Sequence, residues 1–169
     1  ANAEQLKTIC DHSGVVVPAN LNAPGQVIIS GDIEAVDIAL TTARELGIRR
    51  IVPLNVSGAF HSPLMRFARK PLQEIINSVN FQDAKVPVYQ NVVAKAVTDI
   101  KNIRKNILNQ LENPVLWSDT ISEMVKNGMT EFIEVGPGKV LNGLNRRINK
   151  NIITHNFDKM EHLDTCAML

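Results

Sequence analysis

The chain has 169 residues, of which 44% are hydrophobic and 4% aromatic, enough for one domain or two small ones with a core of mainly Ile, Val and Leu. Its 18 Lys and Arg residues nearly balance its 17 Asp and Glu residues. This balance argues against nucleic acid or an anionic membrane as the main partner, while a local basic pocket for one phosphorylated ligand stays open.

The two cysteines, Cys10 and Cys166, lie near opposite ends of the chain without metal-ligand spacing. This arrangement favours a reduced, cytoplasmic protein over a disulfide scaffold. The sequence shows no apolar run of membrane-spanning length and no signal-peptide pattern at its start. Because Ala1 stands where a native start would carry Met, we expect a processed, cleaved or excised product.

The first third of the chain predicts the order helix, strand, strand, helix, strand. After a helix within residues 1–12, strands at 15–18 and 26–31 flank a turn cluster at 19–25. A helix capped by Asp32 then runs to Leu46, and an apolar run at 48–54 predicts a third strand. This order is that of a ferredoxin-like unit without its opening strand, so we expect an incomplete small subdomain over residues 1–55.

The remainder, residues 56–169, alternates helices with strands, which predicts a parallel sheet in an α/β fold. Helices are expected at 63–79, at 100–110, from Ser118 or Asp119 to Gly128, and at 140–148. Strands are expected at 86–91, 131–135 and 152–154. Two or three strands are too few for a complete parallel sheet, which indicates that part of the protein is absent.

The segment from Val56 to Met65 holds the histidine with the best prospect of a catalytic role. Gly58 allows a turn and Pro63 can open a helix, so His61 is expected on a loop between a strand and a helix. The alternative is a surface or packing histidine. No Gly-x-Ser-x-Gly elbow occurs in the chain, and neither Ser57 nor Ser62 is our candidate nucleophile.

Other polar motifs have a structural and a functional interpretation. The segment Gly136-Pro137-Gly138-Lys139 is a tight turn or an anion contact at a helix start, but it lacks the spacing of a nucleotide site. Asn20 and Asn22 are turn residues or contacts of a polar ligand, and Gln110 alone predicts a solvated side chain. Three further sets are interpreted as surface residues: His12, His155 and His162, which show no persuasive metal spacing; Lys101, Arg104 and Lys105; and Arg66, Arg69 and Lys70.

Together these segments resemble the malonyl-CoA:acyl carrier protein transacylase family of fatty acid synthesis. The matching motifs are Asn20-Leu21-Asn22-Ala23-Pro24-Gly25-Gln26 with Ile29-Ser30-Gly31, Ser57-Gly58-Ala59-Phe60-His61-Ser62 with Leu64-Met65, Gln110-Leu111-Glu112-Asn113-Pro114-Val115-Leu116-Trp117, and Glu134-Val135-Gly136-Pro137-Gly138-Lys139-Val140-Leu141. Four ordered motifs over roughly 125 residues make a specific match.

The resemblance implies a role for each matching site residue. His61 resembles the general base, and Gln110, or backbone near it, resembles the group that orients the imidazole. Asn20 and Asn22 resemble residues that contact CoA or the pantetheine arm of the carrier protein. Phe60 resembles the residue that favours malonyl over methylmalonyl by crowding the extra methyl group. No metal is expected, and no cofactor, because the CoA thioester is itself the substrate.

The resemblance also implies an α/β-hydrolase-like core with an inserted ferredoxin-like subdomain, of which this chain looks like the C-terminal part. The nucleophilic Ser and an Arg that grips the malonyl carboxylate belong to the missing N-terminal half, which becomes an expected partner beside malonyl-CoA and acyl carrier protein. The alternatives are a non-catalytic fragment that binds CoA or the carrier, a fragment without function, and an acyltransferase domain of a polyketide-type synthase.

Overall fold

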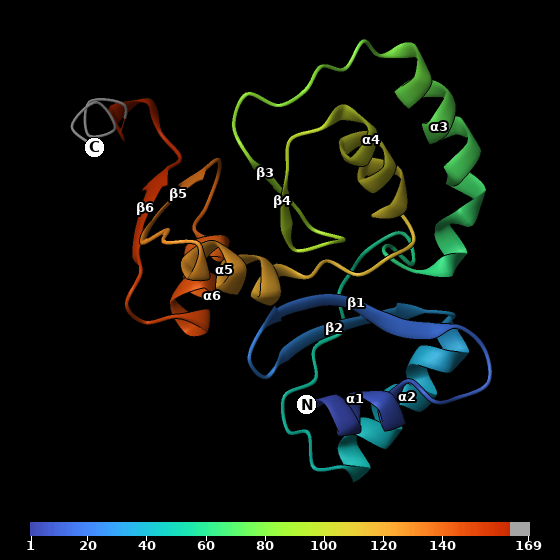
Figure 1. The fold of residues 1–169 in the computed structure, drawn as a ribbon. Helices are drawn as coiled ribbons and strands as arrows, with labels where there is room; N and C mark the ends of the chain where they lie inside the picture. Colours follow the sequence, from blue (N-terminus) through green and yellow to red (C-terminus); the bar gives the residue numbers. More distant parts are fainter. Residues whose placement is uncertain (163–169) are drawn as a thin grey trace.

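The structure, a computed structural model, describes residues 1–162 and has a mixed α/β fold, as the sequence predicts (Figure 1). The strands of this region form three two-stranded sheets, β1–β2, β3–β4 and β5–β6. None of its helices is both long and apolar enough to cross a membrane. Cys10 is half-buried, which raises the pKa of its thiol, and Cys166 lies outside the described residues.

The N-terminal unit packs two helices against an antiparallel hairpin (Figure 1). Its elements are α1 (Ala3–Ile9), β1 (Val16–Ala23), β2 (Gln26–Gly31) and α2 (Ile33–Glu45). Small side chains recur every fourth residue on the buried face of α2, which lets this helix lie close to its neighbours. The buried core consists of Ile9, Val16, Ala35, Ala39 and Ala43.

The turn of this hairpin is shorter than the predicted cluster at 19–25. Only Pro24 and Gly25 form it, and the pair Ala23–Gln26 closes it. Gly25 has a φ of 75°, a left-handed conformation that favours glycine.

The residues before this turn continue β1 because both edges of the strand find partners. One edge of β1 pairs with β2, and the other edge pairs with Val115. There the Leu21 N–H donates to the Val115 oxygen (2.9 Å), and the Val115 N–H donates to the Ala19 oxygen (2.8 Å). This parallel bridge ties the N-terminal unit to the C-terminal half of the chain. Asn20 and Asn22 therefore lie on a strand, which corrects their predicted position beside a turn.

Residues 48–54, predicted as the third strand of the ferredoxin-like pattern, have no regular secondary structure. A strand needs a hydrogen-bonding neighbour, and no strand of residues 1–162 pairs with this segment. The side chains of Val52, Leu54 and Val56 are 62%, 54% and 61% exposed. The apolar pattern therefore predicted neither the conformation nor the burial of this segment in the chain described here.

The middle of the chain contains two helices where one was expected at 63–79. The 3₁₀ helix η1 (Pro63–Ala68) is followed by α3 (Arg69–Ser78). Pro71 has no N–H to donate to the preceding turn, so an α-helix that began at Pro63 would be interrupted there.

A short hairpin follows α3. Its strands are β3 (Val88–Gln90), shorter than predicted, and β4 (Lys95–Val97), which the sequence pattern did not predict, and they pair antiparallel. The next helix, α4 (Ile100–Asn109), begins with Asp99 as its N-cap and ends at Gln110, close to the predicted bounds.

The C-terminal unit contains the predicted parallel pair of strands. Its elements are α5 (Trp117–Lys126), β5 (Glu131–Val135), α6 (Val140–Ile148), β6 (Ile153–Phe157) and η2 (Met160–His162). β5 and β6 pair in parallel across α6. Leu116, rather than Ser118 or Asp119, precedes the first turn of α5.

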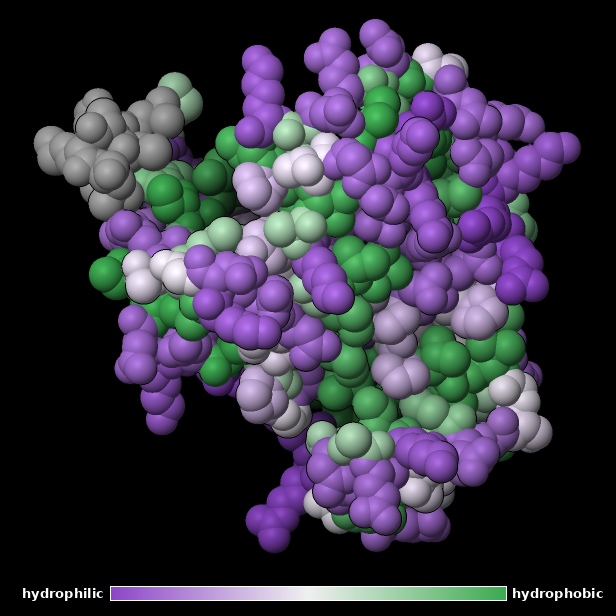
Figure 2. Space-filling model, in the orientation of Figure 1, coloured by the Kyte–Doolittle hydropathy of each residue, from purple (hydrophilic) through white to green (hydrophobic). Residues whose placement is uncertain are grey.

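One face of this parallel pair carries exposed apolar side chains. Ile133, Val135 and Ile153 are 44%, 80% and 55% exposed, although parallel strands are ordinarily covered on both faces. Figure 2 shows apolar side chains in green at the surface on the left of the view, where β5 and β6 lie in Figure 1. This surface resembles the interior of a larger sheet.

Candidate active site

His61 lies in the turn that precedes η1; the helix predicted after it is present, whereas the strand predicted before it is not. Its φ of 59° is in the left-handed region, which non-glycine residues adopt at a cost of about 1–3 kcal/mol. The next residue, Ser62, is fully buried, and its hydroxyl donates to the Ala59 oxygen (2.6 Å) and accepts from the Leu64 N–H (3.3 Å). These bonds hold the turn in the conformation that presents His61 and leave Ser62 with a structural role.

The end of α4 fixes the imidazole of His61. Its Nδ1 lies 2.8 Å from the backbone oxygen of Gln110, the C-cap residue of α4. Carbonyls at a helix C-terminus lack intrahelical partners, so this oxygen is available. A carbonyl oxygen can only accept, so Nδ1 carries the proton and Nε2 of the neutral ring is left as an acceptor. An imidazole held in this way can take a proton from a hydroxyl or a thiol.

A cavity of about 340 Å³ opens beside His61. Its walls come from α1, β1, the beginning of η1 and the turn after α4. Mostly apolar walls with a few polar groups are typical of small-molecule sites. The lining residues are Leu6, Val17, Pro18, Leu21, His61, Pro63, Glu112, Asn113 and Pro114.

Glu112 is a charged group of this cavity that the sequence did not single out. Its carboxylate accepts from Arg69 Nη1 (2.9 Å) and Arg66 Nε (3.1 Å), and these two bonds hold the pKa of the Glu112 carboxyl below its usual range. The interpretation of Arg66 and Arg69 as a solvated helix face is therefore incomplete. Their spacing predicts one helix face, whereas the structure places Arg66 on η1 and Arg69 at the start of α3. No local pattern reveals an acceptor more than forty residues away.

The other predicted site residues do not line the cavity. Asn20 and Asn22 are half-buried on β1. Phe60 is 46% exposed, and its ring lies beside Gly58, where an added Cβ would be 3.5 Å from the Phe60 Cζ. The structure therefore brings His61 and Gln110 together and leaves the three other residues outside this cavity.

The remaining histidines are half-buried rather than fully exposed. His12 Nε2 lies 3.1 Å from a threonine hydroxyl of α2, His155 Nε2 lies 2.7 Å from Glu131 Oε1, and His162 Nδ1 lies 3.2 Å from Asp158 Oδ1. In the part of the chain that the structure describes, no three His, Cys, Asp or Glu side chains cluster closely enough to hold a metal.

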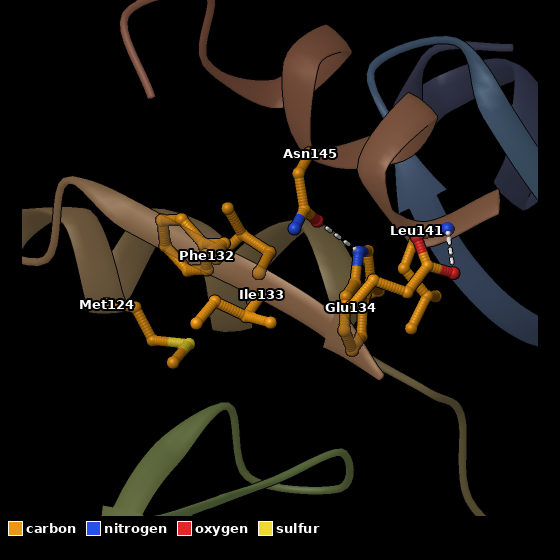
Figure 3. A pocket seen from close by; sticks show the side chains of 8 residues that line it. Met124, Phe132, Ile133, Glu134, Leu141 and Asn145 are labelled. Carbon is orange, nitrogen blue, oxygen red and sulfur yellow. Dashed lines mark hydrogen bonds between the residues drawn. The ribbon is translucent and has the colours of Figure 1, made fainter. Parts of the chain in front are cut away.

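A second, smaller cavity of about 180 Å³ lies between α5, β5 and α6 (Figure 3). The Trp117 indole N–H donates to Asn145 Oδ1 (3.0 Å) at its wall, and Met124, Phe132 and Ile133 add apolar surface. None of the predicted site residues lines this cavity, so its position gives no support for a second reactive centre.

Glu134 explains the glycine-rich turn after β5. Its carboxylate accepts from the N–H groups of Leu141 (3.1 Å) and Asn142 (2.8 Å) at the beginning of α6, and Figure 3 shows the first of these bonds. Gly136 and Gly138 have φ values of 135° and 87°, which let the chain turn tightly between the two elements. Because Glu134 occupies these N–H groups, the structure favours the tight-turn interpretation over an anion site.

Comparison with known proteins places these features in a family context. Residues 1–159 match the family model described as acyl transferase domain. The malonyl CoA-acyl carrier protein transacylase of Bacillus subtilis (strain 168) is 41% identical over 157 residues, which are 90% of this chain and 50% of that protein. This chain therefore spans about half the length of the curated relatives that it matches.

Solved structures agree with the sequence comparison. A malonyl-CoA:acyl carrier protein transacylase from Xanthomonas oryzae pv. oryzae has a TM-score of 0.92 at 37% identity, over 98% of this chain and 54% of that chain. A complex of a type II polyketide synthase acyl-carrier protein with its malonyl-transacylase matches with a TM-score of 0.92 at 33% identity, over 98% and 54% of the two chains.

Proposed function

Because this chain belongs to the acyl transferase domain family, we propose that it supplies the general base of a malonyl-CoA:acyl carrier protein transacylase. The complete protein would move a malonyl group from CoA to the phosphopantetheine thiol of an acyl carrier protein. The observation that carries this proposal is the bond between His61 Nδ1 and the Gln110 oxygen beside a largely apolar cavity, because it leaves Nε2 ready to accept a proton.

The reaction would follow a ping-pong sequence. A serine from outside this chain attacks the thioester carbonyl while His61 Nε2 takes the proton of its hydroxyl. The tetrahedral intermediate then expels the CoA thiolate, which the imidazolium protonates, and malonyl remains on the serine. The carrier thiol repeats these steps and takes the malonyl group. The Gln110 oxygen accepts from Nδ1–H throughout and stabilises the imidazolium less than a carboxylate would.

The partner that completes this site is an N-terminal half, carrying the serine and a carboxylate-binding Arg, in the same polypeptide or in a second one. In this proposal residues 1–55 are a ferredoxin-like subdomain whose sheet the other half extends, and residues 56–169 are part of an α/β-hydrolase-like core. The unpaired apolar segment 48–54 and the exposed side chains of β5 support the proposal, as does the length of the relatives.

The remaining assignments are finer. The solved complex of a malonyl-transacylase with its acyl-carrier protein supports a carrier protein as partner. Because that carrier belongs to a type II polyketide synthase, a polyketide-type carrier is an alternative to a fatty acid one. We assign Asn20 and Asn22 to CoA or the pantetheine arm and Phe60 to selection against a methyl branch. The CoA thioester serves as substrate without a further cofactor or metal, and the compartment is the cytoplasm.

The test of the proposed base is His61→Ala in a complete enzyme, either the natural protein that contains this chain or a chimera with the N-terminal half of the Bacillus subtilis relative. We expect malonyl transfer to fall by about 10²–10⁴-fold, the range of general acid–base catalysis. Mass spectrometry of the acyl-enzyme and a transfer assay with carrier protein measure both half-reactions.

His12→Ala is the matched control, because His12 does not line the cavity and bonds to a threonine of α2, and it should leave the rate unchanged. A His61→Ala enzyme that transfers malonyl at the unmutated rate would disprove the role of the imidazole. An inactive chimera whose isolated C-terminal chain still binds CoA or the carrier would favour the non-catalytic binding module instead.

A further inference from the structure

A cluster of charged side chains joins the helices after His61 to the turn after α4. Arg66 Nε and Arg69 Nη1 each donate to one oxygen of Glu112, so both carboxylate oxygens are engaged. The Glu112 side chain is only 10% exposed, whereas the side chains of Arg66 and Arg69 are 78% and 40% exposed, so the carboxylate is covered while its bond to Arg66 remains open to solvent. Arg69 Nη2 also donates to Asn109 Oδ1 (3.2 Å), so this guanidinium bonds to two residues of the same turn.

The turn held in this way is the one that presents the acceptor for His61. Asn109 and Glu112 stand on either side of Gln110, whose oxygen accepts from the imidazole. The Asn109 oxygen accepts from the Glu112 N–H (3.3 Å) and from Asn113 Nδ2 (2.8 Å), which closes the turn locally. The chain that follows His61 therefore holds the turn after α4 through Arg66 and Arg69, and that turn orients the His61 imidazole.

We propose that Glu112, clamped by Arg66 and Arg69, is a positioning residue that keeps the Gln110 oxygen within hydrogen-bond reach of His61 Nδ1. A hydrogen bond weakens steeply with distance and angle, so a small rotation of the Gln110 peptide would release the ring. The proton would then be free to occupy either nitrogen, and Nε2 would be available as the base for only part of the time. This inference rests on the proposed function of His61.

The physical state of Glu112 fits this role. The pKa of its carboxyl is lowered by hydrogen bonds from Arg69 and Arg66, so it stays ionised throughout the neutral range and the clamp remains charged. Charge-assisted bonds of this kind are shorter and stronger than neutral ones, and an arginine offers two donors in a fixed plane. A neutral amide at position 112 has one acceptor oxygen instead of two and no charge, so it would hold the two guanidinium groups less strongly.

The experiment compares Glu112→Ala, Glu112→Gln and Arg104→Gln in the complete enzyme. Arg104 is the matched control, because it donates to the Ile76 oxygen (3.1 Å) and to Asn77 Oδ1 (3.0 Å), and so links α4 to α3 without contacting the turn that holds Gln110. Glu112→Gln keeps the shape of the side chain, and it tests the clamp if Glu112→Ala fails to fold.

Two readouts separate positioning from general stability. We expect both Glu112 variants to lower kcat about 10–100-fold with KM for malonyl-CoA within about twofold, because a misplacement near 1 Å costs about that much in rate. We also expect the imidazole Nδ1–H proton signal of His61, followed by NMR, to broaden or disappear through exchange. Arg104→Gln should lower the melting temperature and keep both kcat and that signal.

An unchanged Nδ1–H signal in the Glu112 variants would overturn the proposal, and so would an equal fall of kcat in Arg104→Gln. The NMR readout does not depend on turnover. If the unmutated enzyme transfers no malonyl, the proposed function fails, yet loss of the signal in the Glu112 variants alone would still support the positioning role.

Discussion

Gln110 contributes to the site through its backbone, so its side chain should be dispensable. Gln110→Ala keeps the oxygen that lies 2.8 Å from His61 Nδ1, and Ala is a good helix former. We expect a transfer rate within roughly threefold of the unmutated complete enzyme, since the imidazole stays oriented. Gln110→Pro is the counterpart, because it removes the N–H that donates to the Asn106 oxygen (3.0 Å) and displaces the carbonyl.

The two Gln110 variants are compared by steady-state transfer to carrier protein. A large loss of activity in Gln110→Ala would show that the side chain itself acts in the reaction, whereas a normal rate in Gln110→Pro would show that the carbonyl is not needed. Either result would require a different orienting group for His61.

Phe60 tests selection between acyl groups. Phe60→Ser removes the bulk that crowds a methyl branch, and one methyl group is worth about 1–3 kcal/mol, so transfer of methylmalonyl relative to malonyl should rise about 10–200-fold at most. Phe67→Ser is the control, because Phe67 is 77% exposed on η1, and it should leave the ratio unchanged. Competition between the two CoA thioesters measures it, and an unaltered ratio in Phe60→Ser would contradict the steric account. For Asn20→Ala and Asn22→Ala, steady-state transfer assays should show a raised KM for malonyl-CoA or for the carrier protein, and an unchanged KM for both would refute their assignment.

At the residue scale, local pattern found His61 but not its surroundings. Glycine and proline on either side of His61 predict a loop before a helix, and the structure has that loop. Gln110 was singled out only through family resemblance, because a backbone acceptor leaves no trace in the identity of a side chain. The sequence does not indicate the role of Glu112, because its partners Arg66 and Arg69 are distant in sequence. Residue spacing predicts which side chains share a helix face, but it does not predict which residues that face contacts.

At the scale of elements, the sequence predicted best where local and tertiary preferences agree. β5 and α6 have the bounds that the strand run and the glycine turn between them predict, and Glu134 bonds across that turn. The strand predicted at 48–54 is absent because its local and tertiary preferences disagree. An apolar run indicates a tendency to be buried, but it does not show that a partner strand is available to pair with it. β1 runs further than predicted because Val115 pairs with its second edge, a contact that no local pattern contains.

At the scale of the whole molecule, the exposed face of β5 offers a test of the proposed N-terminal half. Val135 is 80% exposed here, on a strand of a parallel pair that ordinarily has both faces covered. If an N-terminal half covers this face, Val135→Asp places an unpaired carboxylate in the interface. We expect the complete enzyme to lose about 2–4 kcal/mol of unfolding free energy, and the isolated chain to change by about 0.5 kcal/mol or less while aggregating less.

Urea unfolding and light scattering of both proteins measure this difference, and Val135→Ile, which keeps the side chain apolar, should be close to neutral in both. An equal effect of Val135→Asp in the two proteins would mean that the face stays exposed in the complete enzyme. The half that carries the serine would then have to reach His61 without packing on β5. The β5 surface and the imidazole therefore test separate parts of the same proposal, one the assembly of the two halves and the other the chemistry that the assembly permits.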